Sequence, residues 1–466
     1  MIDLDFQIIQ QLGYIFSAML FIYGLKMLSK EDTAARGNLI SSTGMFLAVL
    51  VTIVEIINPL LVVSAIVLGG LIGSIFALKV KMTSIPEMVA LFNGFGGLSS
   101  FFLAWSEFNN LTTTSLMMLI TYTTVIIGGV TFSGSVIAFL KLSEMFKGGN
   151  NFLNKASRWF LIFSLIFIAI AGLQIVASSL GIFSFNFEII QQVFIAILII
   201  SILTGLAFVV PIGGGDMPVV ISLLNSLSGI AAASAGILLT NTALIVAGCL
   251  VGASGLVLTL IMAKSMNRTL YNIFFVGYES SGTSSAEIDG EIKPISAEDA
   301  YLVVESARSA LIVPGYGMAV AQAQHVVKEL GDLLEENGCE VSFGIHPVAG
   351  RMPGHMNVLL AEANVPYDNL LEPKDINPKM DTVDIAIVIG ANDVVNPVAR
   401  TDPSSPIYGM PILNADYAKN VIVVKRGQGA GFSGIENALF FLDQTRMLYG
   451  DGQEMASELI QSVKSI

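Results

Sequence analysis

The sequence predicts a multi-pass α-helical membrane domain with nine transmembrane helices, followed by a C-terminal α/β domain built on a doubly wound parallel sheet. Composition is the first indication: the 466 residues are 54% hydrophobic and only 13% charged, which is too apolar for an ordinary soluble protein. Patterning is the second, because nine apolar segments precede a region in which short apolar strands alternate with helical patterns. We therefore expect a transmembrane domain at 1–272, a flexible linker at 273–298 and a soluble domain at 299–466.

Each apolar segment approaches the ~20 residues that an α-helix needs to cross ~30 Å of hydrocarbon. Lys and Arg occur in alternate loops and after the last segment, so the positive-inside rule places the N-terminus outside and the C-terminal domain in the cytoplasm. The acidic start, Met1–Asp5, is unlike a basic signal peptide, so we expect the first segment to be a retained span. The nine segments are 11–28, 39–57, 60–78, 85–105, 115–140, 160–180, 189–210, 217–235 and 240–263.

Charge is distributed unevenly along the chain. Residues 1–272 hold 11 of the 23 Lys and Arg and 10 of the 36 Asp and Glu, which leaves the C-terminal part with a net charge of −14. Such acidity argues against nucleic acid as a partner, because phosphate backbones recruit basic faces. Two cysteines, Cys249 and Cys339, support neither a disulfide framework nor a thiolate metal site, so no metal is expected.

Three polar side chains, Glu87, Asn93 and Asn225, lie in or beside the apolar segments. An unpaired polar group is costly in hydrocarbon, so each is expected either to join helices or to line a hydrated path. Asp216 lies in the connection Val210–Pro218, where capping of the next helix would be a sufficient role. All three histidines lie in the C-terminal part, so the membrane part lacks a histidine that could titrate near neutral pH.

Strand and helix patterns alternate in the C-terminal part, as they do in sheets covered on both faces. The expected strands are 309–314, 340–346, 369–372, 384–390, 420–425 and 446–449, and the expected helices are 317–336, 355–364 and 453–464. The first strand runs into Gly315-Tyr316-Gly317-Met318-Ala319-Val320, in which two glycines lie at a strand-to-helix turn. Such a turn can hold a dinucleotide pyrophosphate, although a tight turn that binds nothing has the same sequence.

The other distinctive motifs also follow strands, at the edge where parallel sheets bind ligands. Lys425-Arg426 suits a phosphate dianion, although a solvated basic pair is the alternative. No acidic residue ends the second strand, where NAD-binding folds place a carboxylate for the ribose, and this favours NADP(H) over NAD(H). The motifs are Arg351-Met352-Pro353-Gly354, Gly390-Ala391-Asn392-Asp393, and Lys425-Arg426-Gly427 with Gly431-Phe432 beyond it.

These motifs resemble the NADP(H)-binding domain of the beta subunit of proton-translocating nicotinamide nucleotide transhydrogenase. The resemblance runs through essentially the whole chain; it is carried by Gly315–Gln324, Gly344–Ala363, Gly390–Pro397 and Lys425-Arg426, and in the membrane half by Arg36–Asn38, Thr131–Lys141 and Gly213–Asn225. It implies a Rossmann-like domain that binds NADP(H), a separate alpha subunit that carries NAD(H), and direct Re/Si-specific hydride transfer from NADH to NADP⁺ coupled to inward proton translocation. The expected setting is a bacterial-type inner membrane, with a dimer of alpha-beta units that regenerates NADPH.

The resemblance also assigns roles to residues. It implies that Gly315, Tyr316 and Gly317, with Met318, Ala319 and Val320 after them, lie near the pyrophosphate, and that Lys425, Arg426 and Gly427 lie near the 2′-phosphate. Arg351, with Met352, Pro353 and Gly354, reaches the nucleotide from its loop; Gly390, Ala391 and Asn392 border it; and Gly431 and Phe432 belong to a lid. Asp393 and Asp216 would couple nucleotide binding to protonation, and Glu87, Asn93 and Asn225 would lie on the proton path.

Three positions depart from the family pattern: Gly427 replaces a frequent serine, Phe432 a frequent tyrosine, and Asn93 a histidine of some bacterial relatives. The last departure implies that a titrating group comes from a partner chain. Two other functions remain open: a transporter or channel whose cytoplasmic domain is a regulatory dinucleotide sensor, and a membrane-anchored NADP-dependent reductase.

Overall fold

The computed structural model describes residues 2–28, 31–54, 59–110, 115–143, 145–146, 151–179, 187–276, 290–352, 354–405, 407–427, 429, 431 and 433–464. They form two compact units, which are described separately. One comprises Met1–Ile212 with Val220–Thr259, and the other comprises Gly213–Val219 with Leu260–Ile466.

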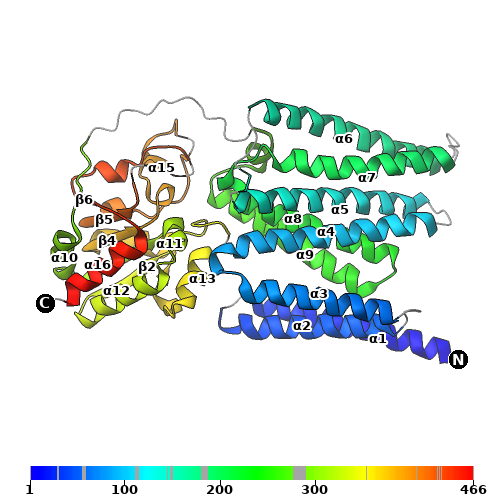
Figure 1. The fold of residues 1–466 in the computed structure, drawn as a ribbon, viewed down its shortest axis with the longest axis horizontal. Helices are drawn as coiled ribbons and strands as arrows, with labels where there is room; N and C mark the ends of the chain where they lie inside the picture. Colours follow the sequence, from blue (N-terminus) through cyan, green and yellow to red (C-terminus); the bar gives the residue numbers. More distant parts are fainter. Residues whose placement is uncertain are drawn as a thin grey trace. The chain divides into compact units, whose positions relative to one another are not determined.

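The first unit is built from long apolar helices (Figure 1). In the described part of the chain, nine helices are long and apolar enough to cross a membrane, which confirms the expected number. Their apolar side chains remain largely exposed, as suits helices that face lipid. The helices are α1 (Ile2–Leu28), α2 (Glu31–Ile53), α3 (Pro59–Lys79), α4 (Ile85–Asn110), α5 (Ser115–Leu142), α6 (Asn151–Ser179), α7 (Phe187–Val209), α8 (Met217–Leu238) and α9 (Thr242–Ser265).

Several basic residues that were expected in loops lie inside these helices. Lys155 and Arg158 belong to the first turns of α6, and Lys141 to the last turn of α5. The helices therefore extend past their apolar segments. A helix that leaves the hydrocarbon can keep its backbone hydrogen bonds in the polar headgroup region of the bilayer.

Glycines allow close helix packing in the first unit. A Cβ on Gly128 of α5 would lie 2.7 Å from the Gly97 carbonyl of α4, and a Cβ on Gly97 would lie 2.9 Å from the Gly128 carbonyl. Such contacts between small residues supply the van der Waals packing that holds membrane helices together, since lipid gives no hydrophobic drive between them.

The second unit contains a six-stranded, all-parallel sheet in the order β3-β2-β1-β4-β5-β6. This confirms the expected doubly wound α/β fold. The strands are β1 (Ser309–Pro314), β2 (Glu340–Gly344), β3 (Leu370–Leu371), β4 (Ile385–Ile389), β5 (Asn420–Lys425) and β6 (Thr445–Tyr449). The helices of this part are α10 (Ala297–Glu305), α11 (Tyr316–Ala321), α12 (Gln324–Glu336), α13 (His355–Glu362), α14 (Pro373–Ile376), α15 (Val398–Thr401) and α16 (Gly452–Lys464).

Both faces of the sheet are covered, which explains why its strands are apolar at every position. Ile312 and Ile387 point to the face covered by α10, α12, α13 and α16 (Figure 1). Their neighbours Leu311 and Val388 point to the opposite face, against Leu413. Alternation with a period of two therefore divides each strand between two cores.

Two helices differ from expectation. The single helix expected at 317–336 is broken into α11 and α12, because Gln322 adopts a left-handed conformation with φ 52° and ends α11. Helix α10 was not expected at all, although Ser296 caps it by accepting the Asp299 N–H at 3.1 Å. Of the expected linker at 273–298, residues 277–289 lie outside the described part of the chain.

Candidate functional site

The candidate site lies where the strand order reverses. From β1 the chain proceeds outward to β2 and β3, and from β4 it proceeds the other way to β5 and β6, so the loops after β1 and β4 diverge. In doubly wound sheets this switch point at the carboxyl edge is where ligands bind.

The loops after β1 and β4 meet backbone to backbone. The Gly315 N–H donates to the Ile389 carbonyl and the Gly317 N–H to the Gly390 carbonyl, both at 2.9 Å. A Cβ on Gly317 would lie 2.7 Å from the Gly390 Cα, and Gly390 has φ +65°, a region that favours glycine. The glycines are therefore required for close approach of two loops, and their N–H groups already have backbone acceptors.

A cavity of about 440 Å³ opens beside these loops, a size that suits a small-molecule ligand. It is bordered by the loops after β1, β2, β4 and β5. Its lining includes Gly315, Tyr316, Gly317, Arg351, Gly390, Ala391, Asn392, Asp393, Lys425, Arg426 and Gly431.

Arg351 is held over the cavity by an aromatic ring and a histidine. Its guanidinium carbon lies 4.6 Å from the centre of the Tyr316 ring, a cation–π contact. Its backbone N–H donates to Nδ1 of His355 at 3.1 Å. Burial, and secondly the Arg351 charge, lower the pKa of His355 to about 4, so this imidazole is neutral and carries its proton on Nε2.

His346 fastens the other end of the same loop. Its Nε2 lies 2.6 Å from the Pro411 carbonyl, and the Val348 N–H donates to its Nδ1 at 3.3 Å. Burial lowers the pKa of His346 to about 4, although the Pro411 carbonyl opposes that shift. Neither histidine was expected to have a role from the sequence, since a residue that orients a loop has no motif of its own.

Asp393 is bonded to the segment that follows Lys425-Arg426. Ser433 donates to both carboxylate oxygens of Asp393, through its N–H at 2.9 Å and through Oγ at 2.6 Å. A side chain on Gly431 would collide with the same carboxylate. The neighbouring residue takes part as well, because the Asn437 amide donates to the Asn392 carbonyl at 2.9 Å. With its amide oxygen turned toward the same segment, Asn392 also accepts the Gly431 N–H at 2.7 Å.

The two adjacent cations differ in environment. The Lys425 ammonium donates to the Gly429 carbonyl and lies 4.8 Å from the centre of the Phe440 ring. Burial lowers its pKa, and the nearby Asp393 charge opposes that effect. The Arg426 side chain is 58% exposed and its Nε lies 3.6 Å from Asp451, so its guanidinium remains accessible to a ligand.

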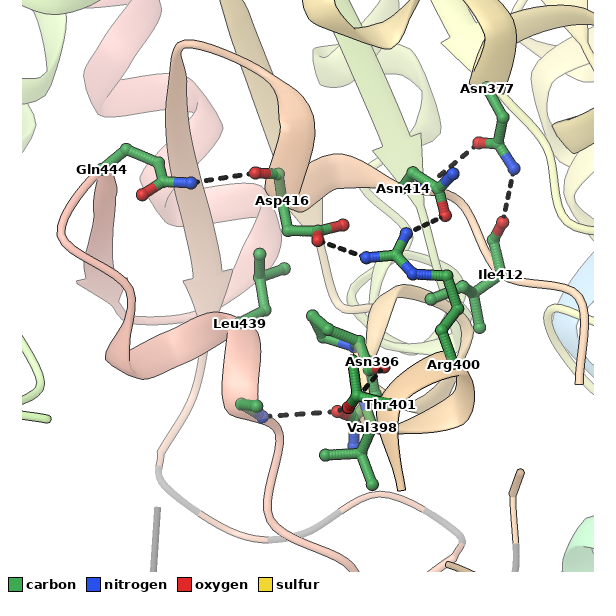
Figure 2. A network of polar contacts seen from close by, with 12 residues as sticks. Asn377, Asn396, Val398, Arg400, Thr401, Ile412, Asn414, Asp416, Leu439 and Gln444 are labelled. Atoms are coloured by element: carbon green, nitrogen blue, oxygen red, sulfur yellow. Dashed lines mark hydrogen bonds and ion pairs between the residues drawn. The ribbon is translucent and has the colours of Figure 1, made fainter. Parts of the chain in front are cut away.

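A polar network supports the chain that follows Asp393 (Figure 2). Arg400 of α15 donates to both Asn414 and Asp416, and the Asn414 N–H donates to the Asn377 side chain at 3.0 Å. The Asn377 amide in turn donates to the Ile412 carbonyl at 2.8 Å. The network ties together segments that are far apart in sequence, and no local pattern predicted it.

The remaining residues that were expected to bind the nucleotide lie outside the described lining of the cavity or outside the described residues. Met318 and Ala319 are buried in the core, Val320 is 44% exposed, and Gly354 has φ +66° at the start of α13. These residues, with Met352 and Gly427, are absent from the described lining of the cavity. Pro353 and Phe432 lie outside the described residues.

In the membrane part, Asn93 joins three helices. Its amide donates to Ser135 of α5 at 3.0 Å, and Ser228 of α8 donates to its carbonyl at 3.2 Å. Asn225 is exposed on α8, and Glu87 lies partly buried in the first turn of α4. The structure therefore does not join Asn93 and Asn225 by a hydrogen bond.

Asp216 is fully buried, and its Oδ2 lies 3.3 Å from Arg268, an ion pair that was not expected from the sequence. Burial raises the pKa of Asp216, and the Arg268 charge opposes the rise. Its other oxygen, Oδ1, has no hydrogen-bond partner among the described residues. The carboxylate thus lies in a dry setting, with a cation rather than a helix cap as its described contact.

Groups of histidine, cysteine or carboxylate side chains that could hold a metal ion are absent from the described residues. The charged side chains in the described lining of the cavity are instead three arginines, a lysine and one carboxylate. This set suits a phosphorylated anionic ligand.

Comparison with known proteins identifies the family. The family model for the NAD(P) transhydrogenase beta subunit matches residues 10–462. Two relatives, both NAD(P) transhydrogenase subunit beta of Rhodospirillum rubrum, are each 42% identical over 476 aligned positions that cover 97% of this chain and 98% of the relative. These matches confirm the resemblance noted from the motifs, and the chain belongs to the family of NAD(P) transhydrogenase beta subunits, multi-pass membrane proteins that use nicotinamide nucleotides.

Proposed function

We propose that this chain binds NADP(H) in its soluble domain and couples hydride transfer to inward proton translocation through its membrane domain. The observation that carries the proposal is the charge around the cavity. Lys425 ends β5 and Arg426 follows it, and both line the cavity. Asp393 is the single carboxylate in the described lining of the cavity. At the end of β2, where an NAD-binding fold would place a carboxylate, the chain has the buried, neutral His346.

When bound, NADP(H) supplies the nicotinamide that accepts or donates hydride. Arg426 is exposed and charged, so it suits the 2′-phosphate, with Lys425 beside it. Arg351, stacked on Tyr316, suits the pyrophosphate. The proposed nucleotide site also includes Met318, Ala319, Val320, Met352, Pro353, Gly354, Gly427 and Phe432, on the strength of the family resemblance.

Partners follow from the relatives' description as a subunit beta. We expect an alpha subunit that presents NADH, direct Re/Si-specific hydride transfer, and activity only in the complex. A dimer of alpha-beta units in a bacterial inner membrane is the expected assembly. The expected domain boundaries remain 1–272, 273–298 and 299–466, with the N-terminus outside and the soluble domain in the cytoplasm.

Coupling would rest on carboxylates whose surroundings can change. Asp216 is buried with a raised pKa, so a modest change in its hydration or in its distance from Arg268 would change its protonation. Asp393 is bonded through Ser433 to the segment beside the cavity, so loss of its charge would weaken that attachment. Glu87, Asn93 and Asn225 are the proposed polar groups along the proton path.

Titration of the purified full-length protein with NADPH and with NADH tests this proposal. NADPH should bind at least about tenfold more tightly, because charge-assisted bonds to the extra phosphate are each worth about 1.5–3 kcal/mol. Arg426→Ala should remove most of that preference with little change in NADH affinity. Lys374→Ala, which removes an exposed lysine paired with Glu372, is the control and should leave both affinities unchanged. Equal binding of the two nucleotides by the unmodified protein would refute the proposed specificity.

A further inference from the structure

Two asparagines of the soluble domain, Asn396 and Asn437, bind each other's stretches of chain. Both are almost completely buried, at 0% and 1% exposed. The Asn396 amide nitrogen donates to the Glu436 carbonyl at 3.1 Å, and its oxygen accepts the Ala438 N–H at 3.3 Å. These backbone groups flank Asn437, so one side chain holds that segment at two points. The Val398 N–H also donates to the Asn396 oxygen at 3.2 Å (Figure 2).

Asn437 makes the reverse connection. Its amide nitrogen donates to the Asn392 carbonyl at 2.9 Å. Its oxygen accepts the Leu439 N–H at 2.9 Å and so caps the short 3₁₀ helix that follows. Asn392 and Asn396 stand at the two ends of the turn Asp393–Val395. The reciprocal contacts of Asn396 and Asn437 therefore form an amide clasp, which bonds both ends of this turn to the chain around Asn437.

The amide clasp joins two stretches of chain that contact charged groups of the cavity. The turn carries Asp393, which lines the cavity. In the other stretch, Ser433 precedes the clasp and donates to both carboxylate oxygens of Asp393. Phe440 follows the clasp, is buried, and has its ring centre 4.8 Å from the Lys425 ammonium. The clasp thus lies between a contact of the cavity's carboxylate and a contact of its lysine.

Stability alone does not require polar side chains at these two positions. A buried amide needs a partner for each polar atom, whereas apolar side chains of similar volume would fill the same space without that need. The side-chain oxygen and nitrogen of Asn396 and of Asn437 all bond to backbone atoms. Hydrogen bonds depend on distance and direction, so a fully satisfied buried pair selects one arrangement of the two stretches.

We infer that Asn396 and Asn437 are positioning residues for the nucleotide site, because the amide clasp fixes the places of Asp393 and Lys425 in the wall of the cavity. Neither asparagine belongs to the described lining of the cavity, so each acts through the residues that it holds. The inference rests on the proposed function, in which this cavity binds NADP(H).

Asn437→Ser tests the amide clasp in the full-length protein. A serine hydroxyl can still cap the 3₁₀ helix, but serine lacks the N–H₂ group that reaches the Asn392 carbonyl. Stopped-flow fluorescence should show NADPH dissociating about tenfold faster, the effect of losing one buried hydrogen bond. Asn437→Asp keeps the shape and the capping oxygen but places an oxygen against the Asn392 carbonyl. It should speed dissociation at least as much.

A double-mutant cycle with Ser433→Ala separates positioning from a general loss of stability. If the clasp acts by holding Asp393 beside Ser433, the two substitutions remove the same restraint. Adding Ser433→Ala to Asn437→Ser should then change the NADPH dissociation rate by less than about twofold. Two unrelated effects would instead multiply.

Two variants serve as controls. Asn420→Ser removes an amide that donates to the Asp384 carbonyl at 3.3 Å at the start of β5, and it should release NADPH at the unmodified rate. Leu334→Ala removes a buried side chain from the core on the opposite face of the sheet from Leu439. It should lower the free energy of unfolding but change NADPH dissociation by less than about twofold.

Amide hydrogen exchange of the nucleotide-free protein tests the clasp without a ligand. Peptides that contain Ser433 should exchange faster in Asn437→Ser than in the unmodified protein, because the Ser433 N–H loses a fixed acceptor in Asp393. The same peptides should be unchanged in Asn420→Ser.

The outcomes distinguish this inference from the proposed function. Unmodified rates of NADPH dissociation in both Asn437 variants, rates that multiply when Ser433→Ala is added, or unchanged exchange around Ser433 would overturn the positioning role. Equal binding of NADPH and NADH by the unmodified protein would instead overturn the proposed function, and faster exchange around Ser433 in Asn437→Ser would still support the clasp.

Discussion

At the scale of single residues, the most informative contact is between Asp393 and Ser433. Both carboxylate oxygens accept a hydrogen bond from the same serine, one from its backbone and one from its hydroxyl. Bonds to a charged acceptor are about twice as strong as neutral ones, so this contact contributes to holding the segment after Arg426 against the cavity. The hydroxyl is the part that a substitution can remove without changing the backbone.

Ser433→Ala is expected to speed NADPH dissociation about threefold to tenfold, because one charge-assisted bond is lost while the backbone bond remains. Stopped-flow fluorescence of NADPH on the full-length protein measures this rate. Ser404 makes a hydroxyl contact of 2.6 Å with Asp402 and is not in the described lining of the cavity, so Ser404→Ala is the matched control. An identical dissociation rate in Ser433→Ala would show that the hydroxyl does not restrain the segment.

At the scale of elements, the site depends on connections between loops that the sheet alone does not determine. His346 ties the loop after β2 to Pro411, and Arg400 ties α15 to Asn414 and Asp416. The Leu413 N–H donates to the Val394 carbonyl at 2.9 Å, so the same segment also supports the turn at Asp393. The loop after β2, helix α15 and the segment that contains Leu413 thereby hold the turn at Asp393, the carboxylate that is expected to take part in coupling.

His346 makes this support sensitive to pH. Its pKa is about 4 when folded and 6.5 when exposed, so between these values the unfolded chain binds a proton that the folded chain excludes. The stabilisation is fully present above pH 6.5 and is lost as the pH falls toward 4, by about 3 kcal/mol in total. His346→Gln, which keeps a donor for Pro411 but does not titrate, should flatten that part of the stability profile.

The free energy of unfolding of the soluble domain is measured by urea titration of the full-length protein at several pH values. Hydrogen exchange of the β4 amides is the readout of each titration. His355 has the same lowered pKa, so the double variant His346→Gln with His355→Gln should be flatter still. His325 is exposed, and His325→Gln is the control that should leave the slope unchanged. A slope in His346→Gln equal to that of the unmodified protein would show that His346 does not cause the dependence.

At the scale of the whole molecule, charge and hydropathy assign the two parts to different surroundings. The membrane part carries nearly balanced charge, whereas the C-terminal part carries a net −14 on a fold with apolar cores on both faces of its sheet. The basic residues near the helix ends provide the orientation signal.

An epitope tag fused to the C-terminus should therefore be digested by added protease in inside-out membrane vesicles and protected in right-side-out vesicles. A tag fused to the N-terminus should show the reverse, since the nine candidate spans of the described residues are an odd number. Western blotting of both vesicle preparations reports the result, and lysis with detergent is the control that exposes every tag. Protection of both tags in the same preparation would contradict the expected orientation.

The sequence by itself determined the features that depend on local composition and period. The nine long apolar helices found among the described residues, the parallel sheet and the motifs after β1, β2, β4 and β5 were all predicted, because hydropathy, alternation and glycine placement act over a few residues. Only the tertiary structure showed the break at Gln322, the ion pair of Asp216 with Arg268, and the contact of Ser433 with Asp393. Such contacts join residues that are distant in the chain and are selected by packing and by the need to satisfy buried polar groups, so they leave no periodic signal in the sequence.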